Sequence, residues 1–328
     1  MDEFDFISKV KPNKTFQHNI VTGIGDDAAI YKATKNYNQV VCVDTMVEGI
    51  HFLKELSSPT DIGYKALAVN VSDIAAMGAI PRYYLVSIAI PPYWKEEDLL
   101  SIYNGMEELA KKYEMDLIGG DTVSIADKLV ITVTVIGEVE EHVQALRSCA
   151  KPGDIVFVTG PLGDSAAGLD ILLGKCDVIC DPLHKEYLIS RHKRPTPRVE
   201  VGRFISLLDR VALNDISDGL ASELNELAES SHVGIVIQER LLPVSPALKS
   251  VEGQYDLSKW ILFGGEDFEL VGATSEEEWE KVKKLCHESD LFIEQIGTVT
   301  DEFQEVRLKR TTNEILKLKK SGFNHFRK

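Results

Sequence analysis

The chain has 328 residues, with 36 Lys and Arg against 52 Asp and Glu, so its formal net charge is −16. That length predicts about two domains. Hydrophobic residues make up 44% and charged residues 27% of the chain, which are ordinary globular values and exclude disordered, collagen-like and coiled-coil proteins. The acidity argues against non-specific binding to nucleic acid or to an anionic membrane surface.

The apolar runs are too short to span a bilayer, so we expect no membrane segment. The first residues are acidic, whereas a secretory signal is basic and then apolar. The five cysteines are scattered and form no C-x-x-C pair, which predicts a reducing, cytoplasmic compartment.

The first half of the chain predicts alternating strands and helices. Its most regular segment is the predicted helix 59–77, where Ser58 can cap the first turn and Gly78 and Pro81 end the last one. In chain order we predict a strand at 40–43, the helix 59–77, a strand at 84–90, a helix at 96–113 and a strand at 128–139.

Turn-forming residues at 149–154 precede a new strand, which predicts a domain boundary near this point. We therefore expect an N-terminal domain over 1–145 and a C-terminal domain over 146–328. The second half predicts a strand at 155–159, a helix after Gly163, helices at 198–208, 221–230 and 276–288, and strands at 234–238 and 292–300. The fold class is α/β or α+β with mixed sheets.

Aspartates recur where strands end. Asp44 follows the apolar strand 40–43, and Asp121 follows the run LIGG. Asp215 and Asp218 follow another such run and precede a helix, while Asp27 lies in the glycine-rich turn GIGDDAA. Carboxylates at strand ends are common at ligand sites of α/β folds, although each could also begin a turn or cap a helix.

Asp73 lies on the predicted helix 59–77, on the face that also carries Ala66, Asn70 and Met77. That face is otherwise apolar, and buried carboxylates are rare unless they are paired or bind a metal. A functional role is therefore favoured over the alternative that Asp73 caps a neighbouring loop.

These six aspartates can share one pocket only if cations neutralise them. Oxygen ligands without His or Cys partners indicate several Mg²⁺ ions rather than Zn²⁺. Several Mg²⁺ ions beside glycine-rich turns in turn predict a polyphosphate substrate. The six are Asp27, Asp44, Asp73, Asp121, Asp215 and Asp218.

The usual nucleotide-binding motifs are missing. The sequence contains no G-x-x-x-x-G-K-[ST] and no protein-kinase H-R-D or D-F-G triplet. The segment 160–168 follows a strand and opens a helix, so it could bind a phosphate at the helix N-terminus.

The motif series as a whole resembles the thiamine-monophosphate kinases, a family of the AIR-synthetase-like (PurM-like) ATP-binding superfamily. The resemblance runs nearly end to end, and the order of its motifs makes it specific. They are GIGDDAA (23–29), DTMVEGIHF (44–52), GYKALAVNVSDIAAMGA (63–79), LIGGDT (117–122), RS (147–148), GDSAAGL (163–169), DISDGL (215–220), GGEDFEL (264–270) and GFNHF (322–326).

The resemblance implies an enzyme that phosphorylates thiamine monophosphate with Mg-ATP, giving thiamine diphosphate and ADP. It implies two AIR-synthetase-like domains, the first forming a barrel across a homodimer. It makes the six aspartates the metal ligands. Residues that match the family's ATP contacts are Tyr103, Gly120, Asp121, Arg147 and Ser217, and those that match its thiamine phosphate contacts are His51, Glu266 and Phe323.

The sequence departs from the family pattern in two segments. Cys42 and Val43 stand where Ser-Thr is common, so only backbone carbonyls could bind metal there. Phe323 stands where Tyr or Trp is common, so it can stack but not donate a hydrogen bond.

The acceptor is itself an ionised phosphate, so we expect direct transfer without an acid–base residue, and a phosphate-contacting or structural His51 rather than a general base. The alternatives are another enzyme of the superfamily, such as an AIR synthetase, and a non-catalytic nucleotide- or cation-binding protein.

Overall fold

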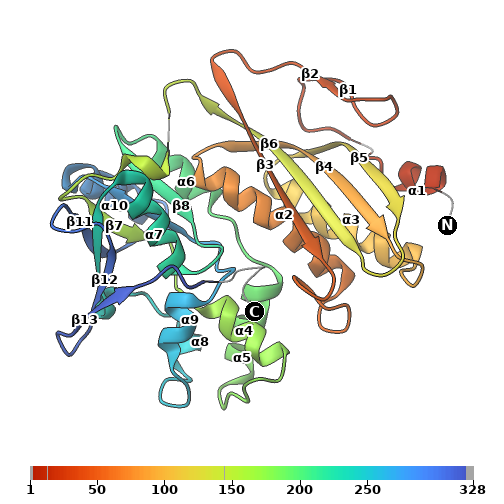
Figure 1. Cartoon of the computed structure of the whole chain (residues 1–328). Coiled ribbons are helices and arrows are strands. Elements are labelled where there is room, and N and C mark those ends of the chain that lie inside the picture. The colour runs from red at the N-terminus through yellow and green to blue at the C-terminus, as the bar shows by residue number, and fades with distance from the viewer. Residues whose placement is uncertain (1–2, 13, 144, 323–328) are drawn as a thin grey trace. The chain divides into compact units, whose positions relative to one another are not determined.

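The computed structural model describes residues 3–12, 14–143 and 145–322 (Figure 1). The chain divides into two compact units. Unit 1 comprises Met1–Ile74 and Ala79–His142, and unit 2 comprises Ala75–Gly78 and Val143–Lys328. In the described part of the chain, no helix has both the length and the apolar character needed to cross a membrane.

Unit 1 is built on a mixed sheet with the strand order β3-β6-β4-β5, in which β4 and β5 run parallel. Two helices, α2 and α3, lie along one face of this sheet (Figure 1). The elements are α1 Glu3–Val10, β1 Ile20–Thr22, β2 Ile30–Tyr31, β3 Tyr37–Val47, α2 Pro59–Ala76, β4 Ile80–Ile90, α3 Glu96–Lys112, β5 Asp116–Ser124 and β6 Val130–Glu140.

The predicted helix 59–77 is confirmed as α2, with the expected signals at both ends. The Ser58 hydroxyl accepts a hydrogen bond from the Asp61 backbone N–H at 3.1 Å. At the other end, Gly78 adopts a left-handed φ of 63°, which favours glycine and stops the helix. Met77 is 36% exposed, so the predicted buried face ends before this residue.

The helices α2 and α3 cross with their backbones in contact. A Cβ atom on Gly63 would lie 1.8 Å from the carbonyl oxygen of Ile102, and one on Gly105 would lie 1.9 Å from that of Thr60. Both positions therefore require glycine, and this close crossing fixes α3 against α2.

Unit 2 contains a seven-stranded sheet with the order β13-β12-β9-β11-β7-β10-β8, in which β9 and β12 run parallel. Its remaining elements are helices and short 3₁₀ turns. The elements are η1 Arg147–Cys149, β7 Ile155–Val158, α4 Asp164–Leu172, α5 Pro182–Lys193, α6 Val199–Ser206, β8 Val211–Asp215, α7 Leu220–Ser231, β9 Gly234–Gln238, η2 Glu239–Leu241, α8 Pro246–Lys249, α9 Leu257–Phe263, β10 Leu270–Thr274, α10 Glu276–Glu288, β11 Glu294–Thr300, β12 Val306–Lys309 and β13 Ile315–Leu318.

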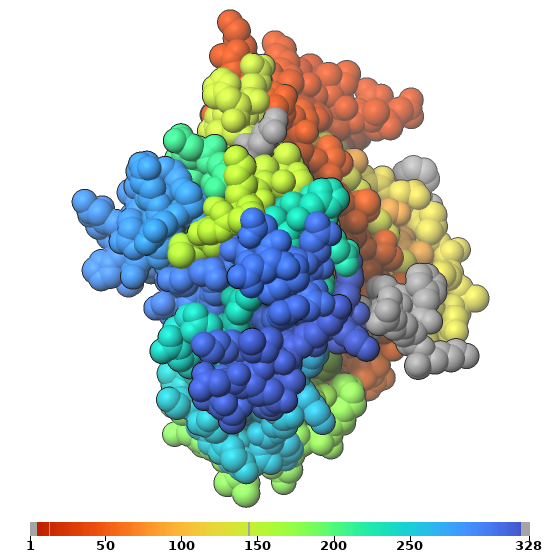
Figure 2. All heavy atoms as spheres, turned by 60° about the vertical axis from the view of Figure 1, so that its left-hand side comes forward, coloured from red at the N-terminus to blue at the C-terminus, as the bar shows by residue number. Residues whose placement is uncertain are grey.

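Alternating residues of the interior strand β7 pack on both faces of this sheet. Val156 and Val158 belong to the core shared with α4, α7 and α9. Phe157 points the other way and stacks on Trp279 of α10, with ring centroids 5.7 Å apart. Figure 2 shows the surface made by the last described residues of unit 2, coloured dark blue.

The mixed α/β class predicted from the sequence is confirmed, and most predicted elements are present. The helix α5 was missed, although Asp181 caps it by accepting from the Leu183 backbone N–H at 2.8 Å and Pro182 occupies its first turn. The predicted strand 40–43 is longer than expected and extends over Tyr37–Val47.

Candidate functional site

Two of the predicted aspartates, Asp44 and Asp73, meet within unit 1. Asp44 projects from β3 toward the helix-covered face, in register with the buried Val133, and Asp73 contacts it from α2. Burial raises the pKa of Asp44, and a hydrogen bond between the two carboxyl groups acts in the opposite direction. Two half-buried carboxyl groups this close share a proton when alone, and a divalent cation would allow both to ionise.

Cys42 and Asn70 line the same place. Asn70 is fully buried, as the sequence predicted, and its side-chain amide donates to the Ala66 carbonyl at 3.1 Å. The Cys42 thiol donates to the Asn70 carbonyl at 3.3 Å. Burial, with Asp73 and Asp44 nearby, raises the pKa of Cys42, so this thiol stays protonated.

Asp121 does not join this pair within unit 1. Its register partner on β4 is Ser87, which faces the open side of the sheet, whereas Asp44 faces the helices. Strands β3 and β5 are opposite edges of the sheet, three strand spacings or roughly 14 Å apart.

Three of the predicted metal- or nucleotide-binding residues of unit 1, Asp27, Gly120 and Asp121, are exposed. Gly120 precedes Asp121, and a Cβ atom there would lie 2.1 Å from the Val86 carbonyl oxygen. Asp27 is exposed in the loop between β1 and β2. Within the residues that the structure describes, no group of three or more His, Cys, Asp or Glu side chains forms a complete metal site.

His51 lies in the turn that follows β3, and its ring is fixed by the backbone. Its Nδ1 accepts a hydrogen bond from the Val47 N–H at 2.9 Å. Because Nδ1 is the acceptor, the proton of the neutral ring is on Nε2. His51 can therefore donate a hydrogen bond through Nε2 but has no basic lone pair there.

Hydrogen bonds to Glu48, at the start of this turn, hold the turn in place. Glu48 is 8% exposed and accepts from the Tyr93 hydroxyl at 2.7 Å and from the Trp94 indole N–H at 3.0 Å. Hydrogen bonds from aromatic donors to a buried carboxylate fix the start of the turn, three residues before His51.

Tyr103 lies on α3 and packs inside unit 1. Its ring meets Phe6 of α1 edge-on, with centroids 5.7 Å apart, and burial raises the pKa of its hydroxyl. This packing gives Tyr103 a structural role in addition to the ATP contact expected from the resemblance.

In unit 2, the structure brings Arg147, Ser217 and Asp218 together through two residues that sequence reasoning missed. Arg147 donates from Nε to the Asn214 side-chain oxygen at 2.8 Å, and the Asn214 amide donates to Glu223 at 2.5 Å. Glu223 also accepts from the Asp218 backbone N–H at 3.1 Å and from the Ser217 hydroxyl at 3.4 Å.

Glu223 is the buried centre of this cluster, with 3% of its surface exposed. Burial, followed by the charge of Asp215, raises the pKa of Glu223 to about 8. Asp215 is 3% exposed, at the end of β8. The cluster therefore combines the buried carboxyl groups of Glu223 and Asp215 with the guanidinium group of Arg147, whose side chain is 52% exposed.

Glu266 lies in a loop that packs on the Ser217 loop. Its backbone adopts a left-handed φ of 66°, and its N–H donates to the Ser217 carbonyl at 2.7 Å. A Cβ atom on Gly265 would lie 2.6 Å from the same oxygen, so glycine is needed for this approach. Phe323 lies outside the described residues, which end at Gly322.

One expectation from the sequence is wrong: the N-terminus of α4 is not open to a phosphate. The Asp267 carboxylate already accepts from the Gly163 N–H at 2.7 Å and from the Ser165 N–H at 3.3 Å. Asp267 is 1% exposed, so an internal carboxyl group occupies the helix terminus.

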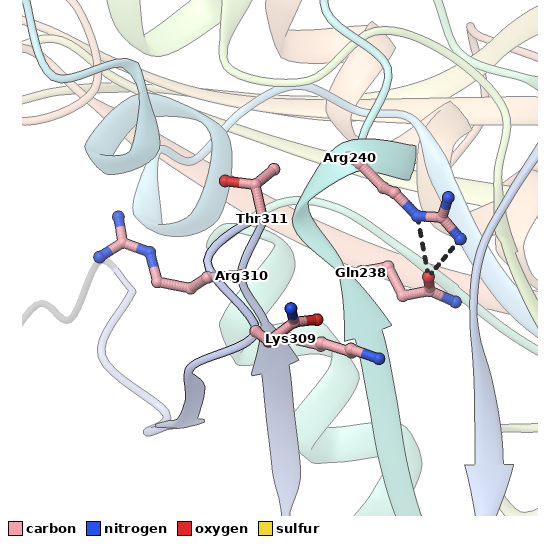
Figure 3. A pocket seen from close by; sticks show the side chains of 6 residues that line it. Gln238, Arg240, Lys309, Arg310 and Thr311 are labelled. Carbon is pink, nitrogen blue, oxygen red and sulfur yellow. Dashed lines mark hydrogen bonds between the residues drawn. The ribbon is translucent and has the colours of Figure 1, made fainter.

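A pocket of about 320 Å³ lies elsewhere in unit 2, near the ends of β9 and β12 (Figure 3). Its lining holds none of the predicted site residues, and Arg240 there donates two hydrogen bonds to Gln238. Arg310 is ion-paired with Glu239 at 3.5 Å. The lining residues are Gln238, Arg240, Lys309, Arg310, Thr311 and Asn313.

Comparison with known proteins gives consistent matches over both units. Residues 25–139 match the N-terminal domain of AIR synthase related proteins, and residues 151–309 match the C-terminal domain. The thiamine-monophosphate kinase of Bacillus subtilis (strain 168) is 54% identical over 327 residues, which cover 100% of each chain.

Two solved structures are similar along most of their length. The thiamine-monophosphate kinase from Stenotrophomonas maltophilia K279a has a TM-score of 0.81 at 34% identity, covering 89% of this chain and 92% of that one. AaThiL complexed with AMPPCP and TMP has a TM-score of 0.75 at 34% identity, covering 90% and 91%.

Proposed function

This chain belongs to the thiamine-monophosphate kinase family of AIR synthase related proteins, and we propose that it transfers the γ-phosphate of ATP directly to thiamine monophosphate with Mg²⁺. The products are thiamine diphosphate and ADP. The observation that carries this function is the 54% identity to the Bacillus subtilis kinase over the full length of both chains. It favours this function over that of an AIR synthetase or a non-catalytic binding protein.

The Asp44 and Asp73 pair supports the magnesium requirement, because hard oxygen ligands in a half-buried anionic site suit this ion. Bound Mg²⁺ would neutralise phosphate charge and so weaken the repulsion between donor and acceptor. We propose Asp44 and Asp73 as ligands in unit 1 and Asp215 and Asp218 as ligands in unit 2. Asp27 and Asp121 remain candidate ligands.

The nucleotide contacts that we propose rest on the cluster around Glu223. Arg147 offers an exposed cation for phosphate oxygens, and Ser217 offers a hydroxyl beside Asp218. Glu223 orients both the hydroxyl and the loop backbone without facing solvent. Gly120 and Tyr103 are further proposed ATP contacts from unit 1.

His51 supports direct transfer without a general base. Its Nδ1 is occupied by the Val47 N–H, so the ring can donate from Nε2 to a phosphate oxygen but cannot accept a proton there. The acceptor phosphate is already an anion and needs no deprotonation. We propose that His51 and Glu266 contact the substrate, together with Phe323.

We also propose a cytoplasmic homodimer. The five cysteines are all free thiols, as expected for a reducing compartment. On the open face of the unit 1 sheet, Val41 is 63% and Val43 is 58% exposed on the edge strand β3. Such a face is suited to pairing with a second copy of the chain.

An acceptor-substrate assay tests the proposed function. The protein is incubated with Mg-ATP and either thiamine monophosphate or formylglycinamidine ribotide, and ADP, inorganic phosphate and the product of each acceptor are quantified. We expect equimolar ADP and thiamine diphosphate with the first acceptor and no turnover with the second. The reverse pattern would assign the chain to AIR synthetase activity.

A further inference from the structure

The side chain of Glu266 is held by a buried histidine that neither the sequence motifs nor the proposed chemistry includes. His192 lies on α5, is 7% exposed, and has its Nδ1 3.2 Å from Glu266 Oε2. The same Nδ1 is 3.2 Å from the Ser165 hydroxyl oxygen. Glu266 keeps 28% of its side chain exposed, so its carboxylate is held from inside the unit while remaining accessible.

The chemistry of these three groups limits their roles. An ionised carboxylate only accepts hydrogen bonds, so a hydrogen bond across the 3.2 Å between His192 Nδ1 and Glu266 Oε2 requires the proton to be on Nδ1. The Ser165 hydroxyl can accept from the same N–H or donate elsewhere. Its residue is anchored because its backbone N–H donates to Asp267 at 3.3 Å.

The backbone of Glu266 is constrained as well. A φ of 66° is uncommon for a residue with a side chain and is a feature that clusters at functional sites. The bond from its N–H to the Ser217 carbonyl fixes the loop on the proposed nucleotide-binding segment. Glu266 is therefore restrained at both its backbone and its carboxylate.

We propose that His192 is a positioning residue for substrate recognition: it holds the Glu266 carboxylate ionised and oriented, so that the other carboxylate oxygen accepts from the thiamine moiety. This inference rests on the proposed function. Thiamine monophosphate carries a positively charged thiazolium ring and an aminopyrimidine with N–H donors, which a fixed carboxylate complements. Holding a flexible glutamate in its binding orientation lowers the entropy lost on binding.

The test measures steady-state kinetics of His192→Ala and His192→Asn, with His184→Asn as the matched control. Asn places an N–H donor near the position of Nδ1, whereas Ala removes it. His184 lies on the same helix, and its Nδ1 has no hydrogen-bond partner among the described residues. We expect His192→Ala to raise the KM for thiamine monophosphate about tenfold, with kcat and the KM for ATP nearly unchanged.

His192→Asn should recover most of this loss, and His184→Asn should match the wild type. The second arm repeats His192→Ala in a Glu266→Gln background, where we expect less than about a twofold further effect because the two residues act as one unit. Equal effects in both backgrounds, or a rise in the KM for ATP, would overturn the proposal. If His192→Ala does not fold, His192→Asn and His192→Gln give the same comparison, because Gln places its donor near Nε2 instead.

Calorimetry measures the binding of thiamine monophosphate with a non-hydrolysable ATP analogue present. It separates a failure of the positioning role of His192 from a failure of the proposed kinase function. A wild-type protein that binds and phosphorylates thiamine monophosphate, but shows no coupling between His192 and Glu266, contradicts only the positioning role. A wild-type protein that neither binds nor phosphorylates it contradicts the proposed function and, with it, this inference.

Discussion

At the scale of single residues, the Asp44 and Asp73 pair explains why the sequence places a carboxylate on an otherwise apolar helix face. Each carboxyl group is half-buried, and burial raises the pKa of Asp44. Such a pair is unfavourable for folding alone, because two like charges compete for one desolvated site. Its presence is best explained by the cation that we propose it binds.

Replacing one member of this pair should separate activity from stability. We expect Asp44→Asn to lower kcat/KM about a hundredfold or more, on the scale of a lost metal or electrostatic contact. In EDTA-treated protein its unfolding midpoint in urea should equal or exceed that of the wild type. The exposed Asp127→Asn is the control. Near-normal turnover of Asp44→Asn at saturating Mg²⁺ would remove Asp44 from the metal site.

The buried Asp267 predicts a pH dependence of stability. Burial raises its pKa from 3.8 to about 7, against the hydrogen bonds from Gly163 and Ser165 and the nearby Arg191 charge. Between these two values the folded state binds the extra proton, so this group's contribution to stability falls as pH rises.

Urea unfolding at pH 5 and pH 8 measures this contribution. Asp267→Asn keeps an acceptor for the α4 terminus but does not titrate, so we expect the wild type to lose stability relative to this variant between the two pH values. Parallel pH profiles for the two proteins would show that Asp267 stays ionised in the folded state.

Sequence reasoning found the site aspartates because a carboxylate in an apolar or glycine-rich context stands out locally. It missed His192 and Glu223 because each lies on an ordinary helix without a motif. The partners of Glu223 lie within nine positions, but only the turn after β8 brings them to it, whereas His192 meets Glu266, 74 positions later. Only the folded packing of α5 on the 263–268 loop reveals such a contact.

At the scale of elements, helices with strong end signals were predictable, as α2 and α10 show. The helix α5 lacked a regular apolar stripe, although Asp181 and Pro182 marked its start. The prediction of a phosphate site at the N-terminus of α4 failed for a different reason. The carboxyl group that occupies this terminus comes from Asp267, about a hundred residues away. A local sequence pattern cannot reveal such a long-range partner.

The crossing of α2 and α3 gives a direct test at this scale. Gly63→Ala would place a Cβ atom 1.8 Å from the Ile102 carbonyl oxygen, so the two helices must separate. We expect the free energy of unfolding to fall by about 2–3 kcal/mol, as for overpacked cores. Asn104→Ala, on an exposed position of α3, should change it by less than about 0.5 kcal/mol. Equal stabilities would mean that the helices do not meet at Gly63.

At the scale of the whole molecule, strand order was beyond sequence reasoning. In unit 2, β7 pairs with β10 and β11, which follow it by more than a hundred residues. Apolar alternation marks a strand but does not name its neighbour. The same holds for the open face of the unit 1 sheet. The apolar alternation alone does not show what covers its exposed valines.

The exposed valines on the open face of the unit 1 sheet predict a homodimer. The intact protein should have a mass near twice 36.5 kDa in light scattering at micromolar concentration. Val43→Asp should shift it toward the monomer, because the charge would be buried in the interface. Ile179→Asp, at an apolar position of unit 2 that is 82% exposed, should leave the mass unchanged. A monomeric wild type with full kinase activity would refute the dimer.

The measurement that tests the central claim most directly is the stereochemistry of phosphoryl transfer. ATP made chiral at the γ-phosphorus by oxygen isotopes is incubated with thiamine monophosphate, and the configuration of the new terminal phosphorus in thiamine diphosphate is determined. Direct in-line transfer without a phosphoenzyme predicts inversion, with one ADP formed for each thiamine diphosphate. Retention of configuration, or ADP formation without thiamine diphosphate, would contradict the account.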